Sequence, residues 1–334
     1  MAVLVTGAAG FIGFHTAKAL LARGEAVIGL DNLNPYYAPQ LKRDRVAELE
    51  RAGGEFRFLE LDFADADGLE AALAGDAIDR IVHLGAQAGV RYSIENPRAY
   101  IQSNLVGHAN VLELARARQV KHLVYASSSS VYGGNRSLPF RVEDRVDHPI
   151  SLYAATKKSD ELMSETYAHL YRLPQTGLRF FTVYGPWGRP DMAVWLFTDA
   201  ILAGRPIRLF NDGELWRDFT YIDDIISGVV ASLDSPPPDD GQPKAGGSFG
   251  PHRLYNIGAH SSQPVTRLVE VLEAACGKKA VIEPYPMQPG DVRDTFADIS
   301  AIQNDLGFQP ATPLEVGAPR FVDWFRRYRG QQLS

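Results

Sequence analysis

The fold is decided by the stretch Val3-Leu4-Val5-Thr6-Gly7-Ala8-Ala9-Gly10-Phe11-Ile12-Gly13. In it, an apolar run of strand length leads directly into three glycines, and a helical pattern follows. The spacing G-x-x-G-x-x-G differs by one residue from the G-x-G-x-x-G of dinucleotide-binding folds. Its physical purpose is the same, because glycines permit a tight turn and let the backbone approach a pyrophosphate at a helix N-terminus.

Asp31 lies eighteen residues beyond Gly13, at the end of the next predicted strand. A carboxylate at this place accepts hydrogen bonds from both ribose hydroxyls of NAD and repels the 2′-phosphate of NADP. The alternative is that Asp31 only forms a turn before Asn32. Asp62 follows the third predicted strand, and we expect it to meet the adenine. The sequence therefore predicts an NAD site.

Apolar runs of strand length alternate with longer stretches of helical periodicity along the first half of the chain. The predicted strands are Val3–Val5, Ala26–Leu30, Phe56–Leu59, Ile81–Leu84, His122–Tyr125 and Thr176–Phe180. The longest predicted helices lie around Tyr100–Arg118 and Tyr153–Tyr171. This alternation predicts an α/β protein with a doubly wound (Rossmann) parallel sheet.

The chain has 334 residues, enough for about two domains. We expect an NAD-binding Rossmann domain over residues 1–180 and a smaller α/β substrate lobe over 181–330, with some segments returning to the Rossmann sheet. Ser235–Pro251 is rich in proline and glycine, so it predicts a surface loop without helix or central strand.

Composition excludes several classes of function. The net charge of −6 offers no broad attraction to nucleic acid or to an anionic bilayer. Cys276 is the one cysteine, which rules out an intrachain disulfide and favours a reducing, cytoplasmic setting. The first apolar run is too short for a signal peptide or a membrane span, so we expect neither. No metal site is predicted.

Tyr153 and Lys157 stand four residues apart, on one face of a predicted helix. The hydroxyls of Ser127–Ser130 follow a predicted strand, at the sheet edge where ligands of open α/β sheets bind. Hydride leaves a secondary alcohol only as its proton leaves, so a base must meet the hydroxyl. A free tyrosine ionises near pH 10. To act as a base at neutral pH, its phenolate must be stabilised relative to the phenol by about 4 kcal/mol.

Two cations can supply that preference for the phenolate, namely Lys157 and the positively charged nicotinamide. Ser128 would hydrogen-bond the same oxygen as Tyr153. The alternative is a helix tyrosine buried by its ring and a serine run that forms an ordinary turn. We predict instead a catalytic set of Tyr153, Lys157 and Ser128.

Four long stretches carry a family resemblance across essentially the whole chain. They are His83–Ser93 (HLGAQAGVRYS), Leu178–Met192 (LRFFTVYGPWGRPDM), Asn211–Thr220 (NDGELWRDFT) and Met287–Val292 (MQPGDV). On these residues the chain resembles the extended short-chain dehydrogenases/reductases, more narrowly the nucleotide-sugar 4-epimerases, and most closely the UDP-glucuronate 4-epimerases. A family of this kind uses tightly held NAD and makes UDP-galacturonate through a transient 4-keto sugar.

The resemblance implies a set of cofactor contacts at the glycine loop and at the following strand ends. They are Gly7, Gly10, Phe11, Ile12, Gly13, Asp31, Asn32, Asp62, Phe63, Leu84, Ala86, Tyr153 and Lys157. It also implies substrate contacts at Ser128, Ser129, Thr182, Arg189, Arg217 and Asp291. Within this set, Arg217 matches the family arginine that meets the diphosphate, and Asp291 would accept from the uridine ribose.

Two positions favour an acidic sugar and disfavour dehydration. Ser130 stands where related dehydratases and decarboxylases carry an acidic residue, so the acid/base for removing water is missing. Thr182 stands where galactose-type epimerases have Asn, and with Ser128 and Ser129 it is our candidate for holding a sugar carboxylate. Galactose-type epimerases also carry an arginine at Gln288, and whether Arg293 replaces it is open.

Three alternatives stay open at this point. Within the superfamily they are a UDP-glucose/galactose 4-epimerase and a UDP-glucuronate decarboxylase, and outside enzymes the alternative is a non-catalytic NAD-binding sensor. We also expect a homodimer that pairs through the helices around 100–118 and 153–171, against the alternative that these faces only pack on the sheet.

Overall fold

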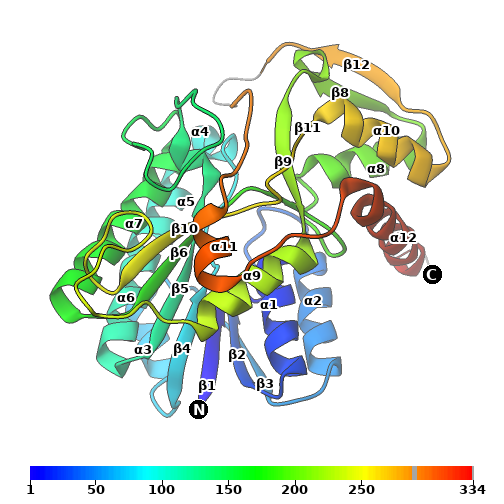
Figure 1. Cartoon of the computed structure of the whole chain (residues 1–334). Helices are drawn as coiled ribbons and strands as arrows, with labels where there is room; N and C mark the ends of the chain where they lie inside the picture. Colours follow the sequence, from blue (N-terminus) through cyan, green and yellow to red (C-terminus); the bar gives the residue numbers. More distant parts are fainter. Residues whose placement is uncertain (288–291, 333–334) are drawn as a thin grey trace.

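A computed structural model describes residues 1–287 and 292–332, and a seven-stranded parallel sheet forms its centre (Figure 1). The strand order is β10-β6-β5-β4-β1-β2-β3. From β1 the chain winds outward in one direction through β2 and β3, and then in the other through β4, β5, β6 and β10. This reversal beside β1 is the mark of a doubly wound Rossmann sheet, which confirms the predicted fold class.

Six strands of this sheet coincide with the predicted apolar runs. They are β1 (Ala2–Thr6), β2 (Ala26–Asp31), β3 (Phe56–Glu60), β4 (Ile78–His83), β5 (His122–Ser128) and β6 (Gln175–Phe180). The seventh strand, β10 (His252–Ile257), was not predicted. It pairs in parallel with β6 along its whole length, from His252 opposite Gln175 to Ile257 opposite Phe180.

Helices cover both faces of the sheet, so its central strands are buried and apolar on both sides. One face carries α1 (Phe11–Ala22), α2 (Pro39–Arg51) and α9 (Ile222–Asp234), where α1 packs between α2 and α9. The other carries α3 (Ala66–Ala72), α6 (Gly107–Arg118) and α7 (Leu152–Tyr171). Since α9 and β10 both come from beyond residue 180, the division of the chain at that residue stays a prediction.

A π-helical segment changes the start of the long helix predicted around Tyr100–Arg118. Two short helices, α4 (Tyr92–Glu95) and α5 (Pro97–Tyr100), lead into the π-helical segment η1 (Ile101–Val106), and α6 follows. In η1, the buried amide of Asn104 donates to Gln87 O at 3.1 Å and to Thr156 Oγ1 at 2.9 Å. The wide turn thus ties the loop after β4 to the first turns of α7.

The second lobe lies over the carboxyl end of the sheet (Figure 1). It contains a three-stranded sheet of order β11-β9-β7 and a two-stranded sheet of β12 and β8. These strands are β7 (Thr182–Tyr184), β8 (Pro206–Phe210), β9 (Trp216–Tyr221), β11 (Ser262–Pro264) and β12 (Val281–Tyr285). Its helical segments are α8 (Ala193–Ala203), α10 (Val265–Cys276), α12 (Leu314–Gln332) and η3 (Asn211–Gly213). Two further segments belong to the main sheet, since η2 (Ser129–Tyr132) follows β5 and α11 (Ser300–Leu306) packs against β10 and α9.

An aromatic cluster stabilises this lobe where α8 meets α12. The ring of Trp195 lies 5.1 Å from that of Phe325 and 5.6 Å from that of Trp324, between ring centroids.

Residues 235–251 contain no helix or strand, as the proline and glycine content predicted. In the part of the chain that the structure describes, no helix has the length and apolar character needed to cross a bilayer.

Candidate active site

A cavity of about 590 Å³ opens at the carboxyl edge of the main sheet, below the second lobe. Its walls come from the glycine loop, from the ends of β2, β4, β5 and β6, from the start of α7 and from the loop after β7. Most predicted site residues line it, namely Gly7, Gly10, Phe11, Ile12, Gly13, Asp31, Asn32, Phe63, Leu84, Ala86, Ser128, Ser129, Tyr153, Lys157, Thr182, Arg189 and Arg217. The parallel strands therefore bring the sequence-distant motifs together.

The glycine loop leaves no room for side chains. Gly7 has a φ of +69°, and a Cβ there would lie 2.7 Å from the backbone nitrogen of Gly85. A Cβ on Gly13 would lie 2.0 Å from the carbonyl oxygen of Gly7. At the start of α1, Gly10 supplies no side-chain cap, so the first backbone N–H groups of the helix are left for an anionic ligand. These features fit a dinucleotide pyrophosphate.

Asp31 ends β2 as a buried carboxylate on the cavity wall. It accepts from the backbone N–H of Leu33 at 2.8 Å, and the ammonium of Lys42 lies 3.7 Å from the same oxygen. Lys42 also donates to Asn34 Oδ1 at 3.0 Å. Sequence reasoning missed Lys42 and Asn34, although both follow Asp31 closely in the chain.

Asp62 does not line this cavity. Its carboxylate accepts from Asn32 Nδ2 at 3.0 Å and from the backbone N–H of Ala64 at 2.9 Å. Asp62 thus holds Asn32, which does line the cavity, instead of facing it. The predicted contact between Asp62 and the adenine stays a prediction.

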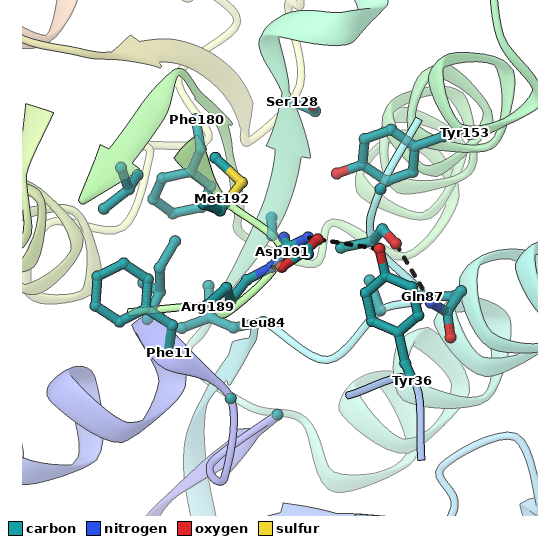
Figure 2. Close-up of a pocket in the computed structure, with 18 of the residues that line it drawn as sticks. Phe11, Tyr36, Leu84, Gln87, Ser128, Tyr153, Phe180, Arg189, Asp191 and Met192 are labelled. Carbon is teal, nitrogen blue, oxygen red and sulfur yellow. Dashed lines mark hydrogen bonds and ion pairs between the residues drawn. The ribbon is translucent and has the colours of Figure 1, made fainter. Parts of the chain in front are cut away.

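Tyr153, Lys157 and Ser128 line the cavity where β5 ends and α7 begins. The hydroxyl of Ser151 caps α7 by accepting from the backbone N–H of Ala154 at 3.1 Å. This cap fixes the first turn of the helix, which carries Tyr153. Figure 2 shows the Tyr153 hydroxyl turned into the cavity, with Ser128 on the adjoining wall. The Tyr153 ring packs edge-on against Tyr100, with centroids 6.0 Å apart.

The ammonium of Lys157 is buried and held by two acceptors. It donates to the carbonyl oxygen of Ala126 at 2.9 Å and to Asp160 Oδ2 at 3.0 Å. Lys157 also adds to the effect of burial on His83, so that the pKa of this imidazole falls to about 3. His83 is therefore neutral at physiological pH, and it bonds Thr6 Oγ1 at 2.7 Å.

The two serines that end β5, Ser127 and Ser128, have different partners. Ser127 donates to Glu161 Oε1 at 2.7 Å, beside the buried pair of Glu161 and Arg179. Burial alone would raise the pKa of Glu161, but Arg179 outweighs it and lowers the pKa. Ser128 accepts from the backbone N–H of Ser130 at 3.1 Å, which leaves its own hydrogen to donate. Both serines line the cavity, but the hydroxyl hydrogen of Ser127 is used on Glu161, whereas that of Ser128 is available to a ligand.

Arg189 lines the cavity within a network that the sequence did not predict. Its guanidinium donates to both oxygens of Asp191, at 3.0 and 2.5 Å. Asp191 also accepts from the hydroxyl of Tyr36 at 3.0 Å, as the dashed line in Figure 2 marks. Burial and the charge of Asp191 raise the pKa of Tyr36 to about 12. The network joins the loop after β2 to the loop after β7.

Arg217, on β9, lines the cavity from the second lobe and donates to the carbonyl oxygen of Arg293 at 2.8 Å. The side chain of Arg293 is 67% exposed and does not line the cavity. Asp291 and Gln288 lie outside the described residues. Within residues 1–287 and 292–332, no group of three or more His, Cys, Asp or Glu side chains is placed to bind a metal ion.

The family model for "NAD dependent epimerase/dehydratase family" matches residues 3–258. A probable UDP-glucuronate 4-epimerase of Rhizobium meliloti is 47% identical over 336 residues, which cover 98% of each chain. A UDP-glucuronic acid 4-epimerase of Bacillus cereus, solved with UDP-glucuronic acid and NAD, is 33% identical with a TM-score of 0.87. That match covers 98% of this chain and 100% of the other.

A UDP-glucose 4-epimerase of Thermotoga maritima, solved with UDP-glucose, is 30% identical with a TM-score of 0.85. The match covers 98% of this chain and 100% of the other. The backbone fold is therefore shared by proteins that act on different sugars. Discrimination between these sugars has to come from side chains in the cavity.

Proposed function

The chain belongs to the NAD dependent epimerase/dehydratase family, and we propose on this basis that it is an NAD-dependent epimerase that interconverts UDP-glucuronate and UDP-galacturonate at C4. The observation that carries the proposal is the presence of Tyr153, Ser128 and Thr182 in one cavity with the glycine loop. The identity to a probable UDP-glucuronate 4-epimerase supports the choice of sugar.

NAD is the cofactor, and the cavity residues fit it. The missing side chains of Gly7 and Gly13 allow the tight loop that a dinucleotide-binding turn needs, and Asp31 suits the two hydroxyls of the adenine ribose. When bound there, NAD would supply a hydride acceptor and donor for C4 of the sugar. The reaction involves no net oxidation, so one bound NAD serves successive turnovers.

Tyr153 acts as the base and then as the acid. It removes the proton from the 4-hydroxyl while a 4-keto sugar forms, and it returns the proton once the sugar has turned over. Lys157 stabilises the phenolate by its charge. Ser128 donates a hydrogen bond to the same sugar oxygen, as its free donor hydrogen permits.

The hydroxyls of Ser129 and Thr182 suit the carboxylate of glucuronate, since the one hydrogen of Ser128 is used on the 4-oxygen. Oxidation at C4 makes a β-keto acid. This acid loses carbon dioxide when the bond between C5 and the carboxylate aligns with the π system of the new carbonyl group. Donors that hold the carboxylate out of this alignment protect the substrate. Ser130 supplies no carboxylic acid for the removal of water, which disfavours dehydration.

We assign the diphosphate of the substrate to Arg217 and Arg189. Both guanidinium groups line the cavity, and the planar fork of arginine matches phosphate oxygens. Arg189 is already paired with Asp191, so a diphosphate would compete with or add to that pair. Asp291 stays a proposed partner of the uridine ribose.

We further propose a homodimer in the cytoplasm. Apolar side chains are exposed along η1 and α7, namely Ile101, Val106, Leu162, Leu170 and Tyr171. The helices that carry them pack side by side on one face of the sheet, and a second copy of this surface would cover both. The single cysteine, Cys276, is buried and unpaired, as suits a reducing compartment.

The experiment is product analysis by NMR after incubation with UDP-glucuronate and, separately, with UDP-glucose. Equilibration of UDP-glucuronate with UDP-galacturonate supports the proposal. Release of carbon dioxide as the main outcome would identify a decarboxylase, and turnover of UDP-glucose alone a galactose-type epimerase. The Tyr153→Phe variant should keep NAD bound and lose at least a hundredfold in rate. Unchanged turnover in that variant excludes Tyr153 as the base, and no turnover by the parent on either sugar favours a sensor.

A further inference from the structure

Asp160 forms a buried ion pair with the lysine of the proposed catalytic set. Its Oδ2 accepts from Lys157 Nζ at 3.0 Å, from three residues further along α7. The two side chains are only 1% and 3% exposed. Neither the predicted catalytic set nor the proposed mechanism uses this carboxylate.

The pair limits how the ammonium of Lys157 can be oriented. An ammonium has three N–H donors, and two of them are used by Ala126 O and Asp160 Oδ2. One donor remains for a ligand in the cavity that Lys157 lines. Asp160 therefore fixes the position of the charge that acts on Tyr153.

The buried carboxylate of Asp160 also has few polar partners besides Lys157. Its second oxygen, Oδ1, is buried without a hydrogen-bond partner among the described residues. Burial raises the pKa of this carboxyl to about 7, although Lys157 acts in the opposite direction. Lys157 is thus the group that favours the ionised form of this buried carboxyl.

The other titratable groups around this pair do not take over its role. The groups that interact with the pair are Glu161 of α7, His108 of α6, His83 of β4 and Tyr125 of β5. Arg179 of β6 pairs with Glu161, and His252 of β10 acts on His108. Burial lowers the pKa of His83 and of His108, so both are neutral at physiological pH. Glu161 and Arg179 neutralise each other at 2.8 Å.

We propose that Asp160 is a positioning residue that holds the Lys157 ammonium and partly cancels its charge, and so sets the pH at which Tyr153 loses its proton. The inference rests on the proposed function, in which Tyr153 is the base. An ionised Asp160 weakens the positive potential of Lys157. Removal of the negative charge should therefore favour the Tyr153 phenolate and not oppose it.

The test is the Asp160→Asn variant, which keeps the shape of the side chain and an oxygen for Lys157. Tyrosinate absorbance is followed as a function of pH in the NAD-loaded protein without sugar. The chain has 14 tyrosines, so the absorbance of the Tyr153→Phe variant is subtracted to isolate the signal of Tyr153. We expect the midpoint for Tyr153 to fall by on the order of one pH unit. The acid limb of kcat/KM for epimerisation should move the same way.

Glu165→Gln is the matched control, because Glu165 is another acidic residue of α7. It accepts from His252 Nδ1 at 2.7 Å and from Ser248, away from Lys157, and its side chain is 41% exposed. In this control the Tyr153 midpoint should stay at the parental value. Urea unfolding of each variant checks that the fold is kept.

A midpoint that rises or stays unchanged in Asp160→Asn overturns the proposal. Loss of activity by the same factor at every pH, with no movement of the midpoint, assigns Asp160 a purely structural role and overturns it as well. The absorbance titration needs no sugar, so it can succeed even if the parent protein does not epimerise UDP-glucuronate. Failure of this inference and failure of the proposed function are thereby distinguished.

Discussion

The guanidinium of Arg45 donates to the carbonyl oxygen of Trp187 at 2.6 Å, across 142 positions in the sequence. The same fully buried side chain donates to Ala9 O at 2.8 Å and to Gly188 O at 3.1 Å. Ala9 lies in the glycine loop, and Trp187 and Gly188 lie just before Arg189. One side chain from α2 therefore fixes the cofactor loop relative to the loop of a proposed substrate-binding arginine.

Arg45→Met should lower the free energy of unfolding by about 3 kcal/mol, because three buried carbonyl groups lose their donor at about 1 kcal/mol or more each. It should also weaken the binding of NAD and of UDP-sugar together, since both loops depend on Arg45. Urea unfolding and titration calorimetry measure the two effects. Arg43→Met, at an exposed position of the same helix, is the control and should be close to parental. Parental stability of Arg45→Met would contradict this role.

Thr182→Val should increase the share of decarboxylated product formed from UDP-glucuronate. The valine keeps the shape of the side chain but removes a hydroxyl from the cavity wall, so the carboxylate of the keto acid is held less firmly. We expect the ratio of pentose to galacturonate product to rise about tenfold, by NMR, for the loss of one such donor. Thr166→Val, on the exposed face of α7, should leave the ratio unchanged. An unchanged ratio in Thr182→Val would remove Thr182 from the carboxylate site.

Stability should fall steeply in mild acid because of buried, neutral histidines. Burial lowers the pKa of His122 to about 3, and its ring bonds Leu233 O at 3.1 Å and Thr176 Oγ1 at 2.9 Å. The unfolded chain binds a proton at this group below about pH 6.5, whereas the folded chain does not. The stability contributed by a neutral His122 is therefore complete above that pH and is lost as the pH falls toward 3.

His122→Gln should reduce the slope of the unfolding free energy against pH by about 1.4 kcal/mol per unit between about pH 6 and pH 4. The lost hydrogen bonds lower stability at every pH, so the slope is the readout, from urea unfolding at several pH values. His148→Gln, at an exposed position, should leave the slope as it is. Equal slopes in the parent and in His122→Gln would refute the assignment.

Leu162→Glu should convert the proposed dimer into a monomer. Leu162 is 58% exposed on α7, and a charge there would be buried without a partner in a symmetric interface. Light scattering coupled to size exclusion measures the mass. Val316→Glu places the same charge on exposed α12, outside the proposed interface, and should stay dimeric. A monomeric parent protein would show that the proposed interface does not form.

Local patterns were sufficient for much of this molecule. The glycine loop identified the cofactor half because the turn after β1 depends on residues adjacent in sequence, such as Gly7 and Gly10. Tyr153 and Lys157 could be paired because helical spacing alone puts them on one face. The six predicted strands were recognisable because strands of a buried parallel sheet are apolar runs.

Contacts between distant segments could not be predicted in this way. The bond between Tyr36 and Asp191 joins residues 155 positions apart, and no local pattern indicates that these two side chains meet. β10 was missed because its residues, HRLYNI, mix polar and apolar side chains that the core satisfies individually. The position of Asp62 behind Asn32 depends on side-chain hydrogen bonding that strand order does not determine.

The pairing of β10 with β6 means that the two halves of the gene cannot be exchanged as independent modules. A fragment that stops after β6 would present that strand as an open edge, a template for aggregation. A chimaera that takes its second half from a relative receives new sugar contacts. It also receives a foreign β10, the outermost strand of the nucleotide-binding sheet. Grafts meant to alter sugar choice should therefore exchange individual loops and retain residues 252–257 of the host.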